Sequence, residues 1–471
     1  MGRAQTLTPM KVLIPPSAAF VLGILSLFPS PAPAQIGRRF PSEKKVVIDL
    51  VTGTELTFLT SKPVGDSKIY QTHHQWTSDG KWVVFRSNRV KGEAMAVNEE
   101  TGDIVQVTEG GFTGMLCLAD HSMSLYFLRT PHVVLGDVSG APAFPSGPAE
   151  AAKGGASRSP SQIVRVDLAA LFADSAAGHM RGESAYQHIC GIVPPEFGAV
   201  GDVALDPTED FAYFRVGGKE EAAKHLAPGT KIEPEYGPRH MGAGPTGLAS
   251  MNLKTGDVKF IVAVPFQIGH VQTNPFVPGE IVFCWETGGK APQRTWTVRS
   301  DGTGLRPLYP EAPYDWVTHE AVITHDEVAI AILGHRHIGV NDAWGIAGTR
   351  EHATGLAIVN LRTREMRIVG QTASGSGIWH VNGSGDGRWA VGDDFSRSIY
   401  LIDRHTGEMV MLTTGHKETA ADHPHPTFNA AGTEIEIESA MLSADNRSMN
   451  ICIIPVPRSW LARTYSEKAP Q

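Results

Sequence analysis

Near the C-terminus the chain reads ADHPHPTF, from Ala421 to Phe428, with two histidines one residue apart and a proline after each. A residue that precedes proline is disfavoured in the α region, so we expect His423 and His425 to be extended. In an extended chain, residues i and i+2 point to the same face. The two imidazoles then point in one direction, which suits a metal ion, an anion or a proton transfer without selecting among them.

Two kinds of hairpin recur along the chain and would position these histidines. In the first kind two strands flank a tight polar turn, as in 73–87, 380–394 and 425–439, with weaker copies near Gly114, Gly201, His270 and His319. In the second kind they flank a D-x-x-T-G-like turn, as in 46–60, 95–109, 248–262 and 399–413. The two kinds alternate at a spacing of about 42 to 49 residues, which predicts an all-β fold, a seven-bladed β-propeller of four-stranded antiparallel blades.

Histidines lie at nearly the same height in five of these repeats. The offset is seven residues from His73 to Gly80, His319 to Asp326, His380 to Gly387 and His425 to Gly432, and nine from His270 to Gly279. The first kind of hairpin would supply the innermost strand of each blade, so these side chains would converge on the central axis. A single one is as readily a structural histidine bonded to a neighbouring backbone. Five in register predict a cluster.

A set of three imidazoles drawn from His319, His423 and His425 would suit metals that accept imidazole nitrogen. An all-imidazole site with open positions leaves room for substrate or water. Pro424 and Pro426 cannot donate hydrogen bonds to a sheet, so we expect their strand at the inner edge of a blade.

The ends of the chain predict how the ring closes. The hairpin at 46–60 would complete the blade whose last strand is 450–456, which leaves no open sheet edge. We therefore divide the chain into a signal peptide at 1–34, an N-terminal linker at 35–45, a propeller at 46–457 and a C-terminal tail at 458–471. Three stretches exceed the repeat spacing: 136–162, which is rich in small residues and proline, and 217–246 and 335–354, which could overhang a binding face.

Residues 1–34 have the parts of a secretory signal: Arg3 and Lys11, an apolar run at 18–28 and the small residues APA at 32–34. The apolar run is short for a bilayer span, so we expect the signal peptide to be removed on export and the mature protein to be periplasmic or secreted. The alternative is that the segment is retained as an anchor.

The net charge of the chain is −8, which argues against nucleic acid or an anionic membrane as partner. The sequence leaves the oligomeric state open. The four cysteines are far apart and we expect small buried side chains.

Several stretches together resemble the oligogalacturonate lyase family, a group of seven-bladed propeller polysaccharide lyases. They are GHVQTNP, IVFCWETG and QRTWTVRSDGTG within 269–304, VTHEAV at 317–322, HVNGSGDGRWAVGDD at 380–394 and HPHPTF at 423–428. They occur in the family's order, and the repeat pattern extends the resemblance over most of 46–457.

The resemblance implies β-elimination on short galacturonate chains, an acidic oligosaccharide as partner, and a divalent metal, Mn²⁺ above all. By motif, His319, His423 and His425 would bind the metal and His270 would be the general base. The substrate-binding set would be Arg294, His74, Gln272 and His380, although Arg294 could instead be a structural guanidinium that pairs an acidic loop.

The sequence departs from the family pattern at two positions. The family has a glutamine ligand three residues before the first histidine of His-Pro-His, where this chain has Ala420, and a histidine where this chain has Trp285. A fourth ligand could come from Asp422, Gln272 or water.

The chemistry is intelligible from the residues themselves. Removing the proton α to a uronate carboxylate builds negative charge that a divalent cation stabilises, and a neutral imidazole is a suitable base. Tyr70, Tyr236 and Tyr314 are possible proton donors, although lone tyrosines are more often packing residues. Two other functions remain: a lyase for another uronate polymer such as ulvan, with a histidine–tyrosine pair, or a non-catalytic exported propeller that binds protein or glycan.

Overall fold

The computed structural model describes residue 2 and residues 35–131, 160–237, 239–313, 315–333, 354–371 and 377–465. All of those from Gln35 onward belong to one compact unit. The predicted signal peptide apart from Gly2, most of the stretches 136–162 and 335–354, and Tyr314 lie outside the described residues.

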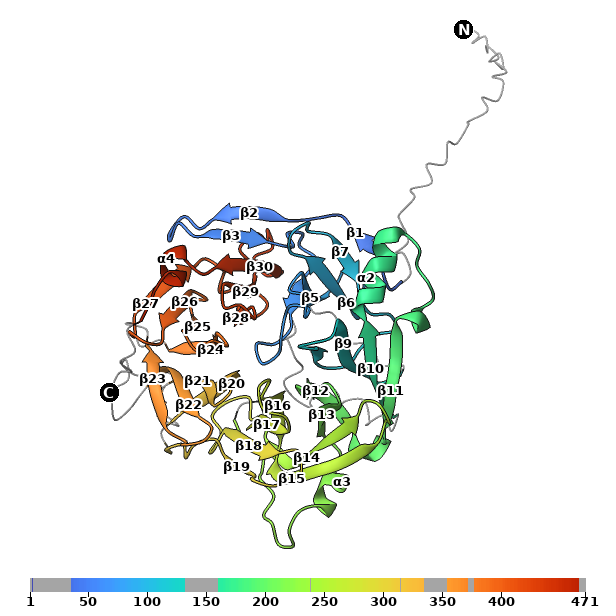
Figure 1. The fold of residues 1–471 in the computed structure, drawn as a ribbon, viewed down its shortest axis with the longest axis vertical. Coiled ribbons are helices and arrows are strands. Elements are labelled where there is room, and N and C mark those ends of the chain that lie inside the picture. Colours follow the sequence, from blue (N-terminus) through green and yellow to red (C-terminus); the bar gives the residue numbers. More distant parts are fainter. Residues whose placement is uncertain are drawn as a thin grey trace. The chain divides into compact units, whose positions relative to one another are not determined.

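The described strands form seven antiparallel sheets that stand in a ring around a central axis (Figure 1). This confirms the predicted seven-bladed β-propeller. Five sheets have four strands and two have five. From the axis outward the first three blades are β4 (Asp66–Lys68), β5 (Trp82–Ser87), β6 (Glu93–Asn98), β7 (Ile104–Gln106) and β1 (Arg39–Phe40); β8 (Leu116–Leu118), β9 (Ser124–Arg129), β10 (Ser161–Asp167) and β11 (Gln187–Val193); and β12 (Ala199–Leu205), β13 (Phe211–Val216), β14 (Ala243–Asn252) and β15 (Val258–Phe266).

The other four blades follow in chain order. They are β16 (Ile268–Thr273), β17 (Glu280–Trp285), β18 (Thr295–Arg299) and β19 (Arg306–Pro307); β20 (Val317–Thr324), β21 (Glu327–Ile332), β22 (Gly355–Asn360) and β23 (Met366–Gly370); β24 (Ile378–Gly383), β25 (Trp389–Asp394), β26 (Ile399–Asp403) and β27 (Met409–Thr413); and β28 (Thr427–Phe428), β29 (Glu434–Ser439), β30 (Asn450–Pro455), β3 (Glu55–Phe58) and β2 (Lys45–Ile48).

The last blade joins the two ends of the chain, as the sequence predicted. Strand β3 pairs with β30, with Phe58 opposite Cys452 in an antiparallel register, and β2 pairs with β3. Strand β28, which follows the His-Pro-His-Pro segment, is the innermost edge strand of this sheet. Within the predicted linker, Arg39 and Phe40 pair with Val105 and Ile104 of the first blade.

The D-x-x-T-G turns have one geometry. The carboxylate of Asp49 accepts hydrogen bonds from the backbone N–H groups of Val51 and Thr52, and the N–H of Gly53, at φ +76°, donates to the Asp49 carbonyl. The side-chain oxygen accepts hydrogen bonds from backbone N–H groups of the turn, and glycine readily adopts the left-handed conformation that the turn requires. The hairpin is therefore specified by residues within the motif itself. The same bonds recur at Asn98, Asn252 and Asp403.

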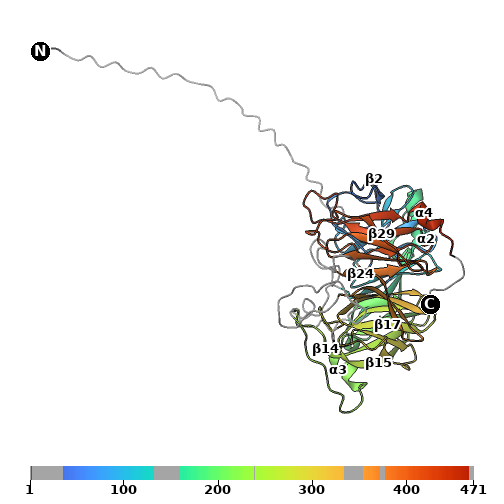
Figure 2. The same ribbon diagram turned by 90° about the vertical axis from the view of Figure 1, so that its left-hand side faces the viewer.

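The described residues also form short helices. They are α2 (Leu168–Ala177), α3 (Lys219–Lys224), α4 (Arg458–Leu461) and the 3₁₀ turns η1 (Glu183–Ala185) and η2 (Pro195–Phe197). Helix α2 begins at the N-cap Asp167 and ends at Gly178, and its Phe172 stacks on Trp82 at a ring distance of 4.1 Å. From the side, α3 lies beside β14 and β15 (Figure 2). Among the described residues, none of the helices has both the length and the apolar character that a bilayer span requires.

All four cysteines are free thiols. Cys117, Cys284 and Cys452 are buried, as predicted, and Cys190 is half-buried.

Candidate functional site

The inner strands of several blades are kinked at one height, where a residue takes a left-handed backbone conformation. The pairing register shifts between Gly269 and Gln272 in β16 and between Thr318 and Glu320 in β20. The residues at these bulges, His270 and His319, have φ values of +51° and +42°. A bulge re-aims the side chain of the bulged strand. Such φ values are uncommon outside glycine, and they cluster at functional sites.

His425 shares this conformation, so the prediction that it is extended is wrong. Its φ is +51°, although Pro426 follows it. The restriction imposed by proline is outweighed by tertiary contacts, because the His425 ring is buried and its Nδ1 lies 2.9 Å from Oε1 of Gln71. His425 therefore occupies the same type of position in its blade as His270 and His319 do in theirs.

Four of the five histidines in register converge, as predicted, and they do so around a tyrosine. The Tyr70 ring centroid lies 4.9, 6.4, 6.2 and 5.1 Å from those of His270, His319, His380 and His425. Tyr70 is only 5% exposed. Burial is the main reason why the pKa of its hydroxyl is well above the usual value, so the phenol stays protonated.

His73 does not join this cluster, and the prediction is wrong there. Its blade pairs Lys68 with Phe85 and then Trp76 with Val83, so residues 69–75 form a loop in place of a continuous inner strand. Counting seven residues back from Gly80 ends inside that loop, and Tyr70 takes the position near the axis instead. The Nε2 of His73 lies 2.9 Å from the backbone oxygen of Val203.

A cavity with a volume of about 200 Å³ opens beside the cluster. Its lining includes Tyr70, His270, Arg294, His319, His380 and His425. Asp422 and Arg215 also line it, so both signs of charge face the same space.

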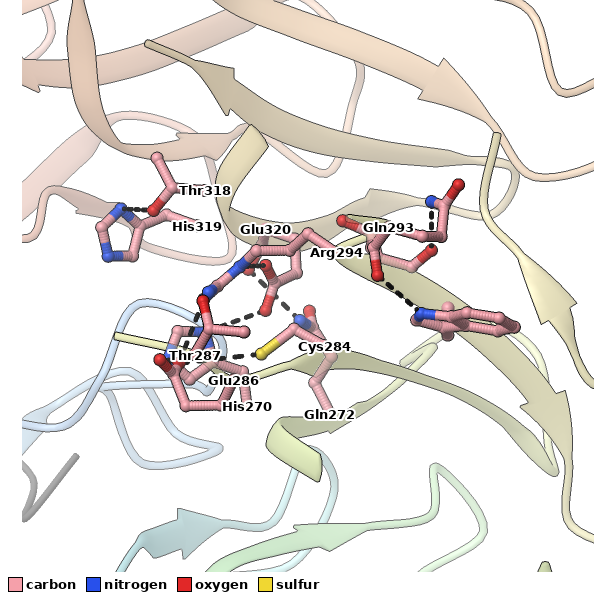
Figure 3. A network of polar contacts seen from close by, with 12 residues as sticks. His270, Gln272, Cys284, Glu286, Thr287, Gln293, Arg294, Thr318, His319 and Glu320 are labelled. Atoms are coloured by element: carbon pink, nitrogen blue, oxygen red, sulfur yellow. Dashed lines mark hydrogen bonds and ion pairs between the residues drawn. The ribbon is translucent and has the colours of Figure 1, made fainter. Parts of the chain in front are cut away.

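His270 lies within a buried network of charges (Figure 3). Its Nδ1 is 2.8 Å from Oε1 of Glu320, and its Nε2 is 3.4 Å from Oε2 of Glu286. Burial alone would lower the pKa of His270, but the carboxylate of Glu320 outweighs burial and the pKa is raised above its usual value. This is the arrangement of a base whose ring is oriented by a carboxylate.

Arg294 lies between the same two carboxylates. Its Nη2 is 3.2 Å from Glu286 Oε2 and its Nε is 3.5 Å from Glu320 Oε2. The side chains of Arg294 and Glu320 are 4% and 0% exposed. Arg294 lines the cavity, yet its charge is already matched by two acidic groups.

The other imidazoles are held through Nδ1. His319 Nδ1 is 2.6 Å from the carbonyl oxygen of Trp379, and Nδ1 of His380 and of His423 lie 3.1 and 2.9 Å from the two oxygens of Asp393. With His425 bonded to Gln71, each ring has an acceptor at Nδ1, which places the proton there and leaves the Nε2 lone pair for a ligand.

Burial keeps the rings of His319, His380 and His425 neutral. Burial and then the neighbouring His425 lower the pKa of His380 to about 3, and burial and then His380 lower the pKa of His319 well below its usual value. Burial also lowers the pKa of His425, against the opposing effect of Asp422. Neutral imidazoles are the form that binds a metal ion.

Two observations fit a cation at this cluster. Nε2 of His425 is buried without a hydrogen-bond partner and lies 3.2 Å from Oδ1 of Asp422, an unaligned contact that a cation between them would satisfy. Ligand atoms of Asp422, His425 and Glu438 lie within 4.8 Å of one another. Imidazole nitrogen with one or two carboxylate oxygens is a suitable donor set for a divalent transition metal.

The two departures from the family pattern have local explanations. Ala420 packs in an apolar cluster with Ala440 and Met449 and does not line the cavity. Trp285 stacks on Phe266 at 4.8 Å and donates its indole N–H to the carbonyl of Gly242 at 3.0 Å. Trp285 therefore anchors the stretch 217–246 against its blade.

The remaining predicted residues lie elsewhere. Gln272 connects two inner strands, because its Nε2 donates to the Glu320 carbonyl at 3.2 Å and its Oε1 accepts from Val322 N–H at 2.8 Å. His74 pairs with Asp120 at 2.8 Å. It lines a second cavity of about 400 Å³, to which Gln71 and His73 also contribute, at the opposite ends of the inner strands.

No protein-family model and no curated protein matches the chain. Among solved structures, an oligogalacturonate lyase in complex with manganese is 18% identical, with a TM-score of 0.64, over 91% of this chain and 100% of that one. The oligogalacturonate lyase from Vibrio parahaemolyticus is 17% identical, with a TM-score of 0.63, over 90% of this chain and 100% of that one. The resemblance found in the sequence is thus confirmed at the level of the fold, and the chain shares the seven-bladed propeller of the oligogalacturonate lyases along about nine-tenths of its length.

Proposed function

We propose that the protein is a metal-dependent lyase that cleaves oligogalacturonate, or a similar uronate oligosaccharide, by β-elimination. The observation that carries this proposal is the meeting of neutral imidazoles from separate blades in one cavity, beside a histidine that is oriented by a carboxylate. The fold shared with oligogalacturonate lyases supports the choice of substrate.

The residues suit a divalent cation, for which we propose Mn²⁺, the metal in the similar solved structure. His319, His423 and His425 would hold it through Nε2, because their Nδ1 atoms are bonded to protein oxygen atoms in each case. When bound, the metal supplies a Lewis acid that stabilises the negative charge developing on the uronate carboxylate. It also offsets the repulsion between an acidic substrate and a protein of net charge −8.

His270 would act as the general base. Its Nδ1–H donates to Glu320, so Nε2 is the atom that takes the proton from C5 of the sugar. The electrons of the C5–H bond form the C4=C5 double bond, and the C4–O bond breaks. The leaving oxygen takes a proton from solvent, the imidazolium of His270 later returns its proton to solvent, and a 4,5-unsaturated uronate remains at the new non-reducing end. Glu320 stabilises the imidazolium that forms and keeps the ring oriented.

We also propose export to the periplasm or the medium, on the basis of the signal-like composition of residues 1–34. Fractionation of cells that express the full chain, with N-terminal sequencing of the product, tests this. Cleavage after residue 34 is expected, and intact cytoplasmic protein would contradict it.

The activity is tested by ultraviolet absorbance, because the new double bond is conjugated with the carboxylate. We expect absorbance to grow with di- and trigalacturonate in the presence of Mn²⁺ and to stop with chelator. Growth only on ulvan fragments would reassign the substrate, and a flat trace on every uronate would favour a binding propeller.

A further inference from the structure

One histidine lies between the three predicted metal ligands. The ring centroid of His380 is 4.2 Å from that of His319, 5.4 Å from that of His423 and 3.7 Å from that of His425. His380 is 2% exposed and lines the same cavity. His380 is therefore in ring contact with all three predicted ligands and shares their cavity wall with His319 and His425.

The orientation of His380 is fixed as that of a ligand would be. Oδ1 of Asp393 accepts hydrogen bonds from both the backbone N–H of His380, at 2.8 Å, and its ring Nδ1, at 3.1 Å. The other oxygen of the same carboxylate holds Nδ1 of His423 at 2.9 Å. A carboxylate behind a ligating imidazole sets the tautomer and raises the basicity of the free nitrogen. Here one carboxylate does so for two rings.

We propose that His380 is a metal ligand, so that His319, His380, His423 and His425 form a four-imidazole site. This deepens the proposed function, since it concerns the metal of the same site, and it replaces the assignment of His380 to substrate binding. It also accounts for Ala420, whose side chain packs against Ala440 and Met449 and offers no donor atom.

The donor set has a consequence for metal choice. Carboxylate and carbonyl oxygens suit manganese, whereas imidazole nitrogen suits zinc, nickel and copper. A fourth imidazole in place of an amide oxygen raises affinity for zinc relative to manganese.

X-ray absorption of the zinc-loaded wild-type protein counts the imidazoles without any variant. Four imidazoles are expected, and three or fewer would overturn the proposal. Full-length protein that has been treated with chelator is then titrated with Zn²⁺ and with Mn²⁺ in a calorimeter.

His380→Ala should weaken Zn²⁺ binding by about tenfold or more, the scale on which changes around metal sites act. The matched control is His188→Ala, which removes an exposed histidine from the outer strand β11 and should leave the affinity unchanged. Unchanged affinity in His380→Ala, with a raised KM for digalacturonate, would return His380 to substrate binding. X-ray absorption and calorimetry are both independent of cleavage. A four-imidazole site in a protein that cleaves no uronate would contradict the proposed function and leave this inference standing.

Discussion

Nδ1 of His270 lies 2.8 Å from Oε1 of Glu320, and the two residues belong to the inner strands of neighbouring blades. His270 is in β16 and Glu320 directly follows the bulge at His319 in β20. The same bulge thus places His319 at the cavity and the next side chain, Glu320, against His270 of the adjacent blade. Contact between the blades and orientation of the His270 ring both follow from one backbone irregularity.

Glu320→Gln should move the pH profile of the proposed reaction to lower pH. The base must be neutral, so activity is lost as pH falls through the pKa of His270, which the Glu320 carboxylate raises above its usual value. Without that charge the effect of burial, which lowers the pKa, dominates. We expect the acidic limb of kcat/KM to move to lower pH.

Glu286 and Arg294 also face His270, the first raising its pKa and the second lowering it, so Glu286→Gln should give a smaller shift in the same direction. His270→Ala should reduce kcat by about 10²–10⁴-fold and leave metal content intact. An unmoved acidic limb in Glu320→Gln would show that another group titrates, and unreduced turnover in His270→Ala would remove His270 as base.

Arg294→Ala should act on stability more than on substrate binding. The change leaves Glu286 and Glu320, both buried, without their shared cation. Breaking a buried pair in this way costs about 3–5 kcal/mol in the free energy of unfolding. Urea unfolding followed by tryptophan fluorescence measures the loss.

The control for this change is Arg299→Ala, at the exposed end of the same strand β18, which should be nearly neutral. If Arg294→Ala instead keeps wild-type stability and raises KM alone, Arg294 binds the substrate, as the family resemblance implies.

The hairpin turns of this fold could be predicted from the sequence because each turn is specified by its own residues. In each D-x-x-T-G turn a short polar side chain closes the turn and glycine takes the left-handed conformation, so the motif carries its own geometry. A fifth turn of this geometry, at 360–364, departs from the sequence motif because Arg364, at φ +66°, stands in place of glycine, while Asn360 still accepts the same two hydrogen bonds. The closing hairpin was predictable because an open propeller would expose a sheet edge.

The centre of the site was only partly predictable, since it depends on contacts between blades. The offset between histidine and turn correctly predicted that four histidines meet near the axis: His270, His319, His380 and His425. It failed at His73, where the inner strand is interrupted. Nothing in the local sequence marks Tyr70 as the residue near the axis. The partners Glu320, Asp393 and Gln71 were likewise missed, because each meets its histidine only after another strand has packed.

Phe58→Ala should show how much the joining of the chain ends contributes to stability. Phe58 lies in β3, the strand that pairs with β30, and it is fully buried against the core of the last blade. Truncating a buried phenylalanine costs about 3–5 kcal/mol. Urea unfolding of this variant is compared with Val51→Ala, at a position that is 70% exposed in the turn before β3 and should be nearly neutral. A cost below about 1 kcal/mol would mean that this strand adds little to the closure.

Buried histidines away from the cavity should make the protein sensitive to acid, and His416 tests this. It is 1% exposed, its Nδ1 lies 2.7 Å from Ser439 Oγ, and burial lowers its pKa to about 4. The unfolded chain takes up a proton near pH 6.5, whereas the folded protein does so only near pH 4. The contribution of neutral His416 to the free energy of unfolding is therefore constant above about pH 6.5. It declines as pH falls from about 6.5 to about 4 and is constant again below pH 4.

For His416 the full loss of stability between these two pH values is about 3 kcal/mol. Urea unfolding of the wild type should show a loss of stability between pH 7.5 and pH 4.5. In His416→Gln this loss should be smaller by about 2–3 kcal/mol. His188→Gln, on the exposed outer strand β11, should keep the wild-type loss. Equal losses in all three proteins would mean that the His416 ring gains its proton as readily in the folded state as in the unfolded state. Protonation in the folded state would then require the loop between β27 and β28 to open locally and expose the ring.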